Sequence, residues 1–148
     1  MVGQKSSNTI EVRLPSRMGY EKIAMNTAAS VAKLIGFDEG RIEDLKTAVA
    51  EACINAMEHG NKMDESLSVG VILSMDEGSL EVKVLDSGTG PQGNVHTPDI
   101  DKKMHGEEAS RGMGMFLIQE LVDEAEWVSS SPHGSYVRMV IRMGKEEK

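Results

Sequence analysis

The chain has 148 residues, of which 39% are apolar and 27% charged, the usual balance of one globular domain with its own core. Its formal charge of −8 and its scattered lysines and arginines argue against a nucleic-acid surface, which needs clustered basic residues. The single cysteine, Cys53, excludes an internal disulfide, indicates a reducing cytoplasm and is predicted to be a core residue. No apolar run reaches the ~18 residues of a transmembrane helix, and the polar N-terminus is unlike a signal peptide, so we expect no membrane segment.

The first part of the chain predicts one strand and two helices. Alternating apolar residues indicate a half-buried strand over 9–14. Apolar residues at helical spacing then indicate helices over 18–35 and 38–58, ended by Gly36 and Gly60. Each helix carries an apolar stripe that must pack against another layer.

The rest of the chain adds four strands and one helix. The same patterns indicate strands over 67–73 and 80–84, a helix over 113–122, and strands over 126–129 and 135–143. Asp86 continues the alternation of the strand before it, so its side chain should point inward at the strand end. Residues 87–111 show no periodicity, and a stretch of this length is usually functional or disordered.

This order of elements predicts an α+β fold. We expect a two-layer α/β sandwich, in which a mixed, mostly antiparallel sheet carries the helices on one face. Neither a repeat nor a linker divides the chain, so residues 1–148 should form a single domain.

Residues 51–61, Glu-Ala-Cys-Ile-Asn-Ala-Met-Glu-His-Gly-Asn, are the most informative segment. On a helix, Glu51 and Asn55 lie one turn apart on the same face, among apolar neighbours typical of a buried helix. A buried carboxylate and a buried amide need partners, because unpaired polar groups are costly to bury. One interpretation is a Mg²⁺ ion with a phosphorylated ligand, in which Asn55 holds the ion and Glu51 is a general base. The other is an internal hydrogen bond to a neighbouring strand.

Two motifs that contain glycine follow this segment. Residues 86–90, Asp-Ser-Gly-Thr-Gly, place a carboxylate before two glycines that permit close approach to a flat ligand, although such a sequence also forms common turns. Residues 111–115, Arg-Gly-Met-Gly-Met, lead into the third predicted helix, where free backbone N–H groups can receive an anion. Neither motif matches the phosphate-binding pattern G-x-x-x-x-G-K-[ST] or the strand-linked dinucleotide motif.

The order and spacing of the three motifs resemble the ATP-binding fold shared by histidine kinases, gyrase, Hsp90 and MutL. Within that superfamily the chain is most similar to the anti-sigma-factor serine/threonine-protein kinases, whose N-box typically reads Glu-Ala-x-x-Asn-Ala-x-x-His-Gly. Residues 51–60 fit this N-box throughout, and residues 41–50 and 112–124 are also similar to the family. The resemblance covers roughly residues 9–143.

The resemblance implies roles for individual residues. Glu51 would be the catalytic base that activates a serine of a protein substrate, Asn55 would ligate Mg²⁺, and Asp86 would accept a hydrogen bond from the adenine amino group. The lid over ATP would lie within residues 87–111. The residues implied to hold the nucleotide are Asn55, His59, Asp86, Gly88, Gly90, Arg111, Gly112, Met113, Gly114 and Met115. For His59, a structural role at the helix end remains an alternative.

Two positions depart from that family. A lid arginine often stands two residues before the first glycine of the last motif, whereas here Arg111 directly precedes Gly112 and Ser110 takes the earlier place. The family also often has a threonine in the final strand that supports the adenine site, and here Ser135 and Tyr136 occupy that region.

The predicted function is that of an anti-sigma factor that binds ATP and Mg²⁺ and phosphorylates a serine on an anti-anti-sigma protein. Its expected partners are a sigma factor, this antagonist and a second copy of the chain in a homodimer. A non-catalytic ATP-binding anti-sigma factor or regulatory module is the alternative, prompted by the two departures. The detached ATPase domain of a histidine kinase fits less well, because the N-box of histidine kinases has a different amino-acid sequence.

Overall fold

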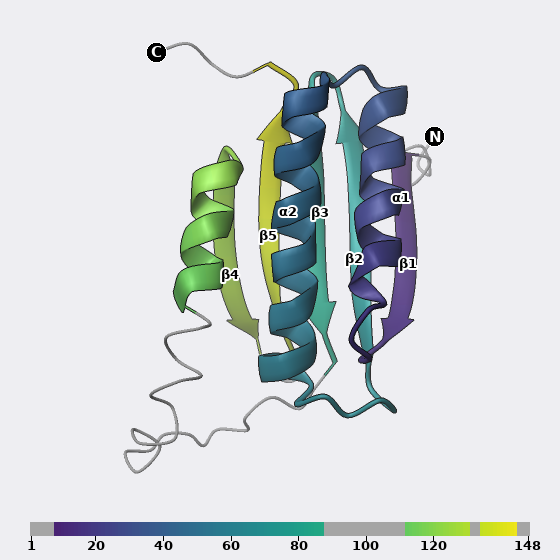
Figure 1. Cartoon of the computed structure of the whole chain (residues 1–148), viewed down its shortest axis with the longest axis vertical. Helices are drawn as coiled ribbons and strands as arrows, with labels where there is room; N and C mark the ends of the chain where they lie inside the picture. The colour runs from purple at the N-terminus through teal and green to yellow at the C-terminus, as the bar shows by residue number, and fades with distance from the viewer. Residues whose placement is uncertain (1–7, 88–111, 131–133, 145–148) are drawn as a thin grey trace.

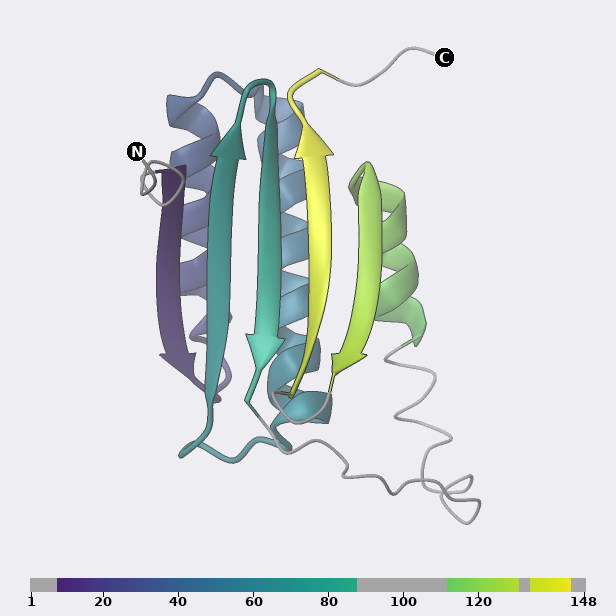
Figure 2. The same ribbon diagram turned by 180° about the vertical axis from the view of Figure 1, so that it is seen from behind.

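The computed structural model describes residues 8–87, 112–130 and 134–144, which form two layers. One layer is a five-stranded sheet with the strand order β1-β2-β3-β5-β4. The other consists of the described helices, which all lie on the same face of the sheet (Figure 1), and none of them lies on the opposite face (Figure 2). The predicted α+β sandwich is therefore confirmed.

The sheet is antiparallel at all four of its described pairings. Its strands are β1 (Thr9–Pro15), β2 (Ser68–Asp76), β3 (Ser79–Asp86), β4 (Glu124–Ser130) and β5 (Gly134–Arg142). Each of them was predicted, with ends that differ by at most three residues. The hairpin between β2 and β3 turns at Gly78, whose φ of 76° is readily adopted only by glycine.

The helical layer contains α1 (Glu21–Leu34), α2 (Glu39–Asn55) and an unlabelled helix over residues 112–121. The start predicted for α1 is too early, because Gly19 has a φ of 104° and the chain turns there before it enters the helix. Asp38 caps α2 by accepting a hydrogen bond from the Arg41 N–H at 2.9 Å. At its other end, α2 continues into the π-helical turn η2 (Ala56–Gly60), which completes the helix predicted over 38–58.

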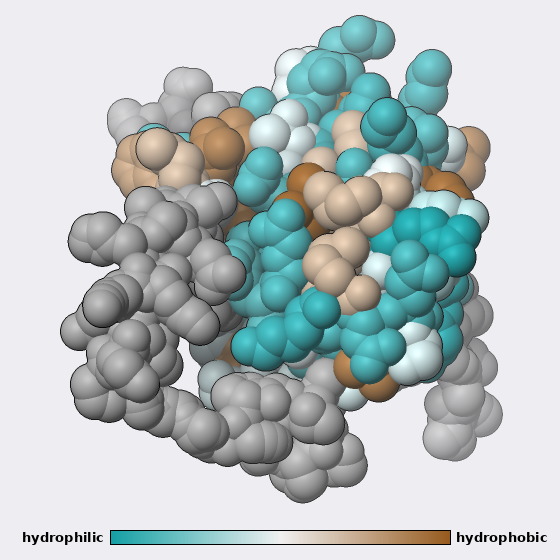
Figure 3. Space-filling view, turned by 60° about the horizontal axis from the view of Figure 1, so that its bottom comes forward, coloured by the Kyte–Doolittle hydropathy of each residue, from teal (hydrophilic) through white to brown (hydrophobic). Residues whose placement is uncertain are grey.

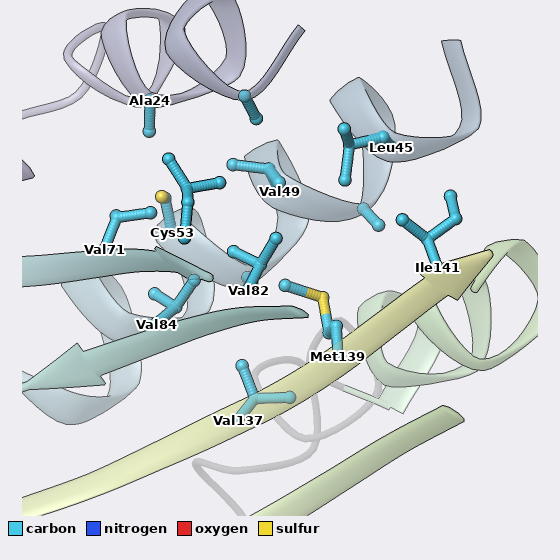
Figure 4. Packing of buried hydrophobic residues seen from close by; sticks show 14 of the residues in the cluster. Ala24, Leu45, Val49, Cys53, Val71, Val82, Val84, Val137, Met139 and Ile141 are labelled. Carbon is cyan, nitrogen blue, oxygen red and sulfur yellow. The ribbon is translucent and has the colours of Figure 1, made fainter. Parts of the chain in front are cut away.

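The core lies between α1, α2 and the sheet, as Figure 4 shows. Leu45, Val49 and Cys53 of α2 are fully buried against apolar side chains of β2, β3 and β5. Burial, with a smaller contribution from the nearby Glu21 carboxylate, raises the pKa of the Cys53 thiol to about 12. Cys53 is thus the neutral core residue that the sequence predicts.

A buried arginine joins α2 to the strands at one end of the molecule. Arg41 is 5% exposed, and its guanidinium donates to Asp44 Oδ2 at 3.0 Å, Asp123 Oδ2 at 2.6 Å and the Arg142 carbonyl oxygen at 3.2 Å. Asp123 Oδ2 also accepts the Arg142 N–H at 2.7 Å. We call these four residues the Arg41 cluster. None of the described helices is both long enough and apolar enough to cross a membrane.

Candidate functional site

The opposite end of the molecule holds a cavity where five elements meet. It lies at the lower end in Figure 1, where α2 and β3 finish and β5 begins. The cavity measures about 70 Å³. Its lining comes from α2, η2, β3, β4 and β5: Ala52, Asn55, Ala56, Gly60, Val84, Asp86, Trp127, Val128, Ser129, Ser135, Tyr136 and Val137. This volume is smaller than the roughly 300–1,000 Å³ that pockets for small ligands usually have.

Two of the predicted motifs are in contact beside this cavity. Gly114, in the first turn of the helix over 112–121, is buried against Glu51 and Asn55 of α2. A Cβ atom on Gly114 would lie 2.8 Å from Glu51 Oε1 and 3.3 Å from Asn55 Nδ2. A side chain there would require the Glu51 carboxylate or the helix start to shift, so the glycine lets the helix N-terminus lie directly against the Glu51/Asn55 pair.

The Asn55 amide is only partly satisfied by the protein. Its Nδ2 atom is buried and has no hydrogen-bond partner among the residues that the structure describes. For this atom, the internal hydrogen bond to a neighbouring strand is therefore not found within the described residues. Buried polar atoms are paired in the great majority of cases, so an exception beside a cavity suggests a ligand.

The carboxylate of Asp86 lies at the end of β3 and points into the helical side of the sheet, as predicted. It is 8% exposed, and its Oδ1 accepts the Ser135 N–H at 3.3 Å. A Cβ atom on Gly60 would overlap this carboxylate, and one on Gly134 would overlap the Asp86 carbonyl oxygen. Two glycines and one backbone N–H therefore enclose Asp86 from two sides. Ser135, at one of the two departures from the family, contributes through its main chain.

The other predicted site residues have different positions. His59 lies in η2 with its side chain 14% exposed and its Nε2 atom 3.9 Å from Glu58 Oε1, and it is not among the cavity-lining residues. Gly112 and Met113 are exposed at the start of the helix, and Met115 is half-buried. Gly88, Gly90, Arg111 and the rest of the predicted lid lie outside the described residues.

Two residues near the cavity were missed by the sequence analysis. Trp127 lines the cavity from β4, directly opposite Val137 in the register with β5. The sequence signal that could have identified Trp127 was its place in the strand predicted over 126–129. Asn61 directly follows the N-box and is 1% exposed, and no periodicity identifies it.

The described surface around this end is mainly hydrophilic, with small apolar areas between (Figure 3). A helix N-terminus, a buried carboxylate and a buried amide together suit a ligand that is polar and anionic at one side and has a hydrogen-bond donor at the other.

Comparison with known proteins identifies the class of this fold and site. Residues 14–141 match the family model described as the histidine kinase-like ATPase domain. A crystal structure of the RsbU and RsbW domains of a Mycobacterium tuberculosis protein aligns with 95% of this chain at a TM-score of 0.66 and 18% identity, which shows the fold alone. The chain spans 34% of that larger protein. It thus has a histidine kinase-like ATPase domain.

Curated relatives define the family more closely. The serine-protein kinases RsbW of Bacillus licheniformis and Bacillus subtilis are each 33% identical over 132 residues, which cover 82% of this chain and 78% of the relative. RsbW of Bacillus pumilus is 35% identical over 135 residues, which cover 82% of this chain and 79% of that protein. The chain belongs to the anti-sigma-factor serine/threonine-protein kinase family within this superfamily, as the sequence analysis predicts.

Proposed function

We propose that this protein is an anti-sigma factor that binds ATP with Mg²⁺ and phosphorylates a serine on an anti-anti-sigma protein. The observation that carries the proposal is the contact of Gly114 with Glu51 and Asn55 beside the cavity that contains Asp86. In this arrangement, Asp86 would hold the base of ATP, and Asn55 with the start of the helix over 112–121 would hold its phosphates. The relationship to RsbW supports the choice of serine as the acceptor.

The base side of ATP would be held by Asp86. Its carboxylate accepts hydrogen bonds and lies in the cavity with a backbone N–H on Oδ1. The exocyclic amino group of adenine donates hydrogen bonds, so the two groups are complementary. In inosine triphosphate an oxygen replaces this amino group and would face the carboxylate unfavourably.

The phosphate side would be held by the start of the helix over 112–121 and by Asn55. Free N–H groups at the helix N-terminus attract an anion, and an amide oxygen is a suitable ligand for Mg²⁺. Residues 8–87, 112–130 and 134–144 contain no group of three or more His, Cys, Asp or Glu that could form a metal cage of their own. This fits Mg²⁺, which keeps several waters and is usually shared between a few protein ligands and the phosphates. When bound, the ion would neutralise charge on the phosphates.

Glu51 would be the general base for the transfer. The serine oxygen of the substrate would bond to the γ-phosphorus while the bond to the β,γ-bridging oxygen breaks and ADP leaves. The serine proton would pass to the Glu51 carboxylate, a type of assistance worth roughly 10²–10⁴ in rate. Glu51 is one helical turn from Asn55, which supports a base position next to the phosphates.

Phosphoryl transfer with labelled ATP tests this function. The intact protein is incubated with ATP, Mg²⁺ and each candidate antagonist from its own cell, and phosphoserine is identified by mass spectrometry. We expect transfer to one antagonist, and we expect Glu51→Gln to lower the rate by roughly 10²-fold or more while ATP affinity by calorimetry is kept. Wild-type rates in Glu51→Gln would exclude the base role.

A non-catalytic ATP-binding module is the second candidate. It is favoured by the two departures from the family, with Arg111 directly before Gly112, and Ser135 and Tyr136 in the final strand. ATP binding and capture of a sigma factor without transfer to any antagonist would support this candidate and contradict the kinase.

The partners and the assembly are also part of the proposal. A sigma factor, an anti-anti-sigma protein and a homodimer in the cytoplasm are the expected setting. Affinity purification from the native cell with and without ATP would identify the partners and show whether nucleotide changes them. Sedimentation of the purified protein measures the assembly, and a monomer at all concentrations would contradict the homodimer.

A further inference from the structure

A second group of polar residues, of which Ser16 and Asn61 are buried, lies next to Asp86. We call Ser16, Asn61, Ser68 and Ser87 the Asn61 cluster. Asn61 lies directly after η2 in the chain, and Ser87 directly after Asp86. The Asn61 side chain belongs to a residue that is only 1% exposed, so all of its polar atoms need partners inside the protein.

The Asn61 amide uses both of its ends. Its Nδ2 atom donates to Ser16 Oγ at 2.8 Å and to the Ser68 carbonyl oxygen at 3.1 Å. Its Oδ1 atom accepts the Ser87 N–H at 3.0 Å. A backbone N–H can only donate and a carbonyl can only accept, so these partners fix the orientation of the amide.

Through these bonds Asn61 connects the ends of three strands. Ser16 follows β1, Ser68 begins β2 and Ser87 follows β3. Ser16 Oγ also donates to the Leu67 carbonyl oxygen at 2.8 Å, and Ser87 Oγ donates to that of Ser68 at 2.8 Å. Three strand ends therefore have a common buried connection, and one of them carries Asp86.

The π-helical turn puts Asn61 in this position. The Asn61 N–H donates to the Ala56 carbonyl oxygen, five residues back, at 2.8 Å. The preceding residue, Gly60, contacts the Asp86 carboxylate with its main chain. Two neighbouring residues thus contact two neighbouring residues at the end of β3. Gly60 contacts Asp86, and the Asn61 side chain accepts a hydrogen bond from the Ser87 N–H.

A purely structural role would explain the burial of Asn61 equally well. The Arg41 cluster shows what such a role looks like, because it joins helix and strands at the end of α2 opposite the cavity. The Asn61 cluster differs because Asn61 binds the Ser87 N–H, which belongs to the peptide bond between Asp86 and Ser87.

We propose that Asn61 is a positioning residue for recognition of the nucleotide base, acting through the Ser87 N–H to set the position of the Asp86 carboxylate. This inference rests on the proposed binding of ATP. It extends that function by naming a residue, outside the N-box and not among the residues that line the cavity, that determines the preference for adenine over hypoxanthine.

The ratio of the affinities for ATP and inosine triphosphate tests the inference. Both nucleotides bind the same folded molecules, so their ratio does not change when a variant is merely less stable. We expect Asn61→Ala to lower this ratio about tenfold, the loss that corresponds to one hydrogen bond to a charged group. Isothermal titration calorimetry of the full-length protein measures both affinities well below the unfolding temperature.

Two control variants separate positioning from stability. Arg41→Ala removes the distant cluster, and Ser16→Ala removes a hydroxyl group of the Asn61 cluster but leaves the bond from the Ser87 N–H to Asn61 in place. Both should lower the unfolding temperature and leave the ratio unchanged. If Asn61→Ala does not fold, Asn61→Ser provides the same readout. The shorter serine side chain keeps a polar hydroxyl group but lacks the Oδ1 atom that accepts the Ser87 N–H.

The possible results differ in what they overturn. An unchanged ratio in the Asn61 variant, with ATP still bound, would overturn the inference alone. An equal loss of the ratio in Arg41→Ala would also overturn it, since the effect would then be general. No binding of ATP by the wild-type protein would overturn the proposed function, and the inference with it.

Discussion

The two ends of α2 carry buried polar groups that differ in how completely they are paired. At its N-terminal end, all three guanidinium nitrogens of Arg41 donate hydrogen bonds to acceptors of the protein. Asp123 also accepts a hydrogen bond from the Arg142 N–H. At its C-terminal end, the Asn55 Nδ2 atom has no partner within the described residues. Within the described residues, the same helix thus has one end whose inward-facing polar atoms are paired and one end with an unpaired amide nitrogen, which we expect to meet a ligand.

Backbone conformation shows the same difference. After η2, Lys62 and Met63 have φ values of 53° and 59°, the left-handed region that residues other than glycine rarely adopt. The N-terminal end instead begins with an ordinary Asp38 cap. Left-handed backbone and an unpaired buried amide at one end are what we expect of an end that binds a ligand, whereas the paired groups at the other end support folding.

The largest expected effect is on stability, at the Arg41 end. We expect Arg41→Ala to lower the free energy of unfolding by about 3 kcal/mol, because two acidic groups lose their buried partner. The unfolding temperature would fall by about 10 °C in a chain of this size, as differential scanning calorimetry can measure. Lys46→Ala is the matched control on the same helix, since the ion pair of Lys46 in the described part of the chain is with Glu43 at 3.6 Å, whose side chain is 69% exposed.

The Lys46→Ala control should cost less than about 1 kcal/mol, as is usual for exposed ion pairs. Equal losses in the two variants would show that the Arg41 cluster has no special contribution. A changed ratio of ATP to inosine triphosphate affinity in Arg41→Ala would show that the two ends of α2 are coupled and would remove the proposed division of roles.

A smaller effect, on binding and transfer, is expected at the other end from Gly114→Ala. The new methyl group would lie 2.8 Å from Glu51 Oε1, so either the helix start or the carboxylate must move. Overpacking of this kind costs about 1–3 kcal/mol, and we expect ATP affinity and phosphoryl transfer to fall by roughly 10- to 100-fold. Calorimetry and the transfer assay measure the two quantities.

Gly112→Ala is the control for this change in the same helix. No described atom lies within 4 Å of a Cβ placed on Gly112, and its φ is not positive. Binding should stay within about twofold of wild type, because alanine is a better helix former than glycine. Similar losses in both variants would mean that the glycines are needed for flexibility rather than for the close contact with Glu51.

The sheet could be predicted from the sequence because its signal is local. Leu80, Val82 and Val84 alternate, and the two-residue period alone places Asp86 on the same face. The meeting of Glu51 with Gly114 could not be derived from periodicity. It was expected only because the order of the motifs resembles a family, and the structure then brought the two residues together.

The two buried polar clusters could not be predicted in this way. Arg41 pairs with Asp123, which lies 82 residues away, and a charged residue on a helix is usually solvated. The position of Asn61 depends on a π-helical turn, whose bond to Ala56 has no sequence signature and is retained through tertiary contacts. The sequence alone therefore does not reveal which polar groups pair across segments that are far apart in the chain.

The smallest effect expected is optical, and it distinguishes the two ends directly. Trp127 is the only tryptophan of the chain and lines the same cavity as Asp86, so its emission reports on the C-terminal end of α2. We expect saturating ATP to change the emission maximum and to reduce quenching by acrylamide, because the base would exclude water from the indole ring. Arg41→Ala should show the same change at a temperature where it is folded, since its substitution is at the opposite end. Saturation by calorimetry with unchanged emission and quenching would place the nucleotide away from this cavity, and the contrast between a completed end and a binding end of α2 would then have to be abandoned.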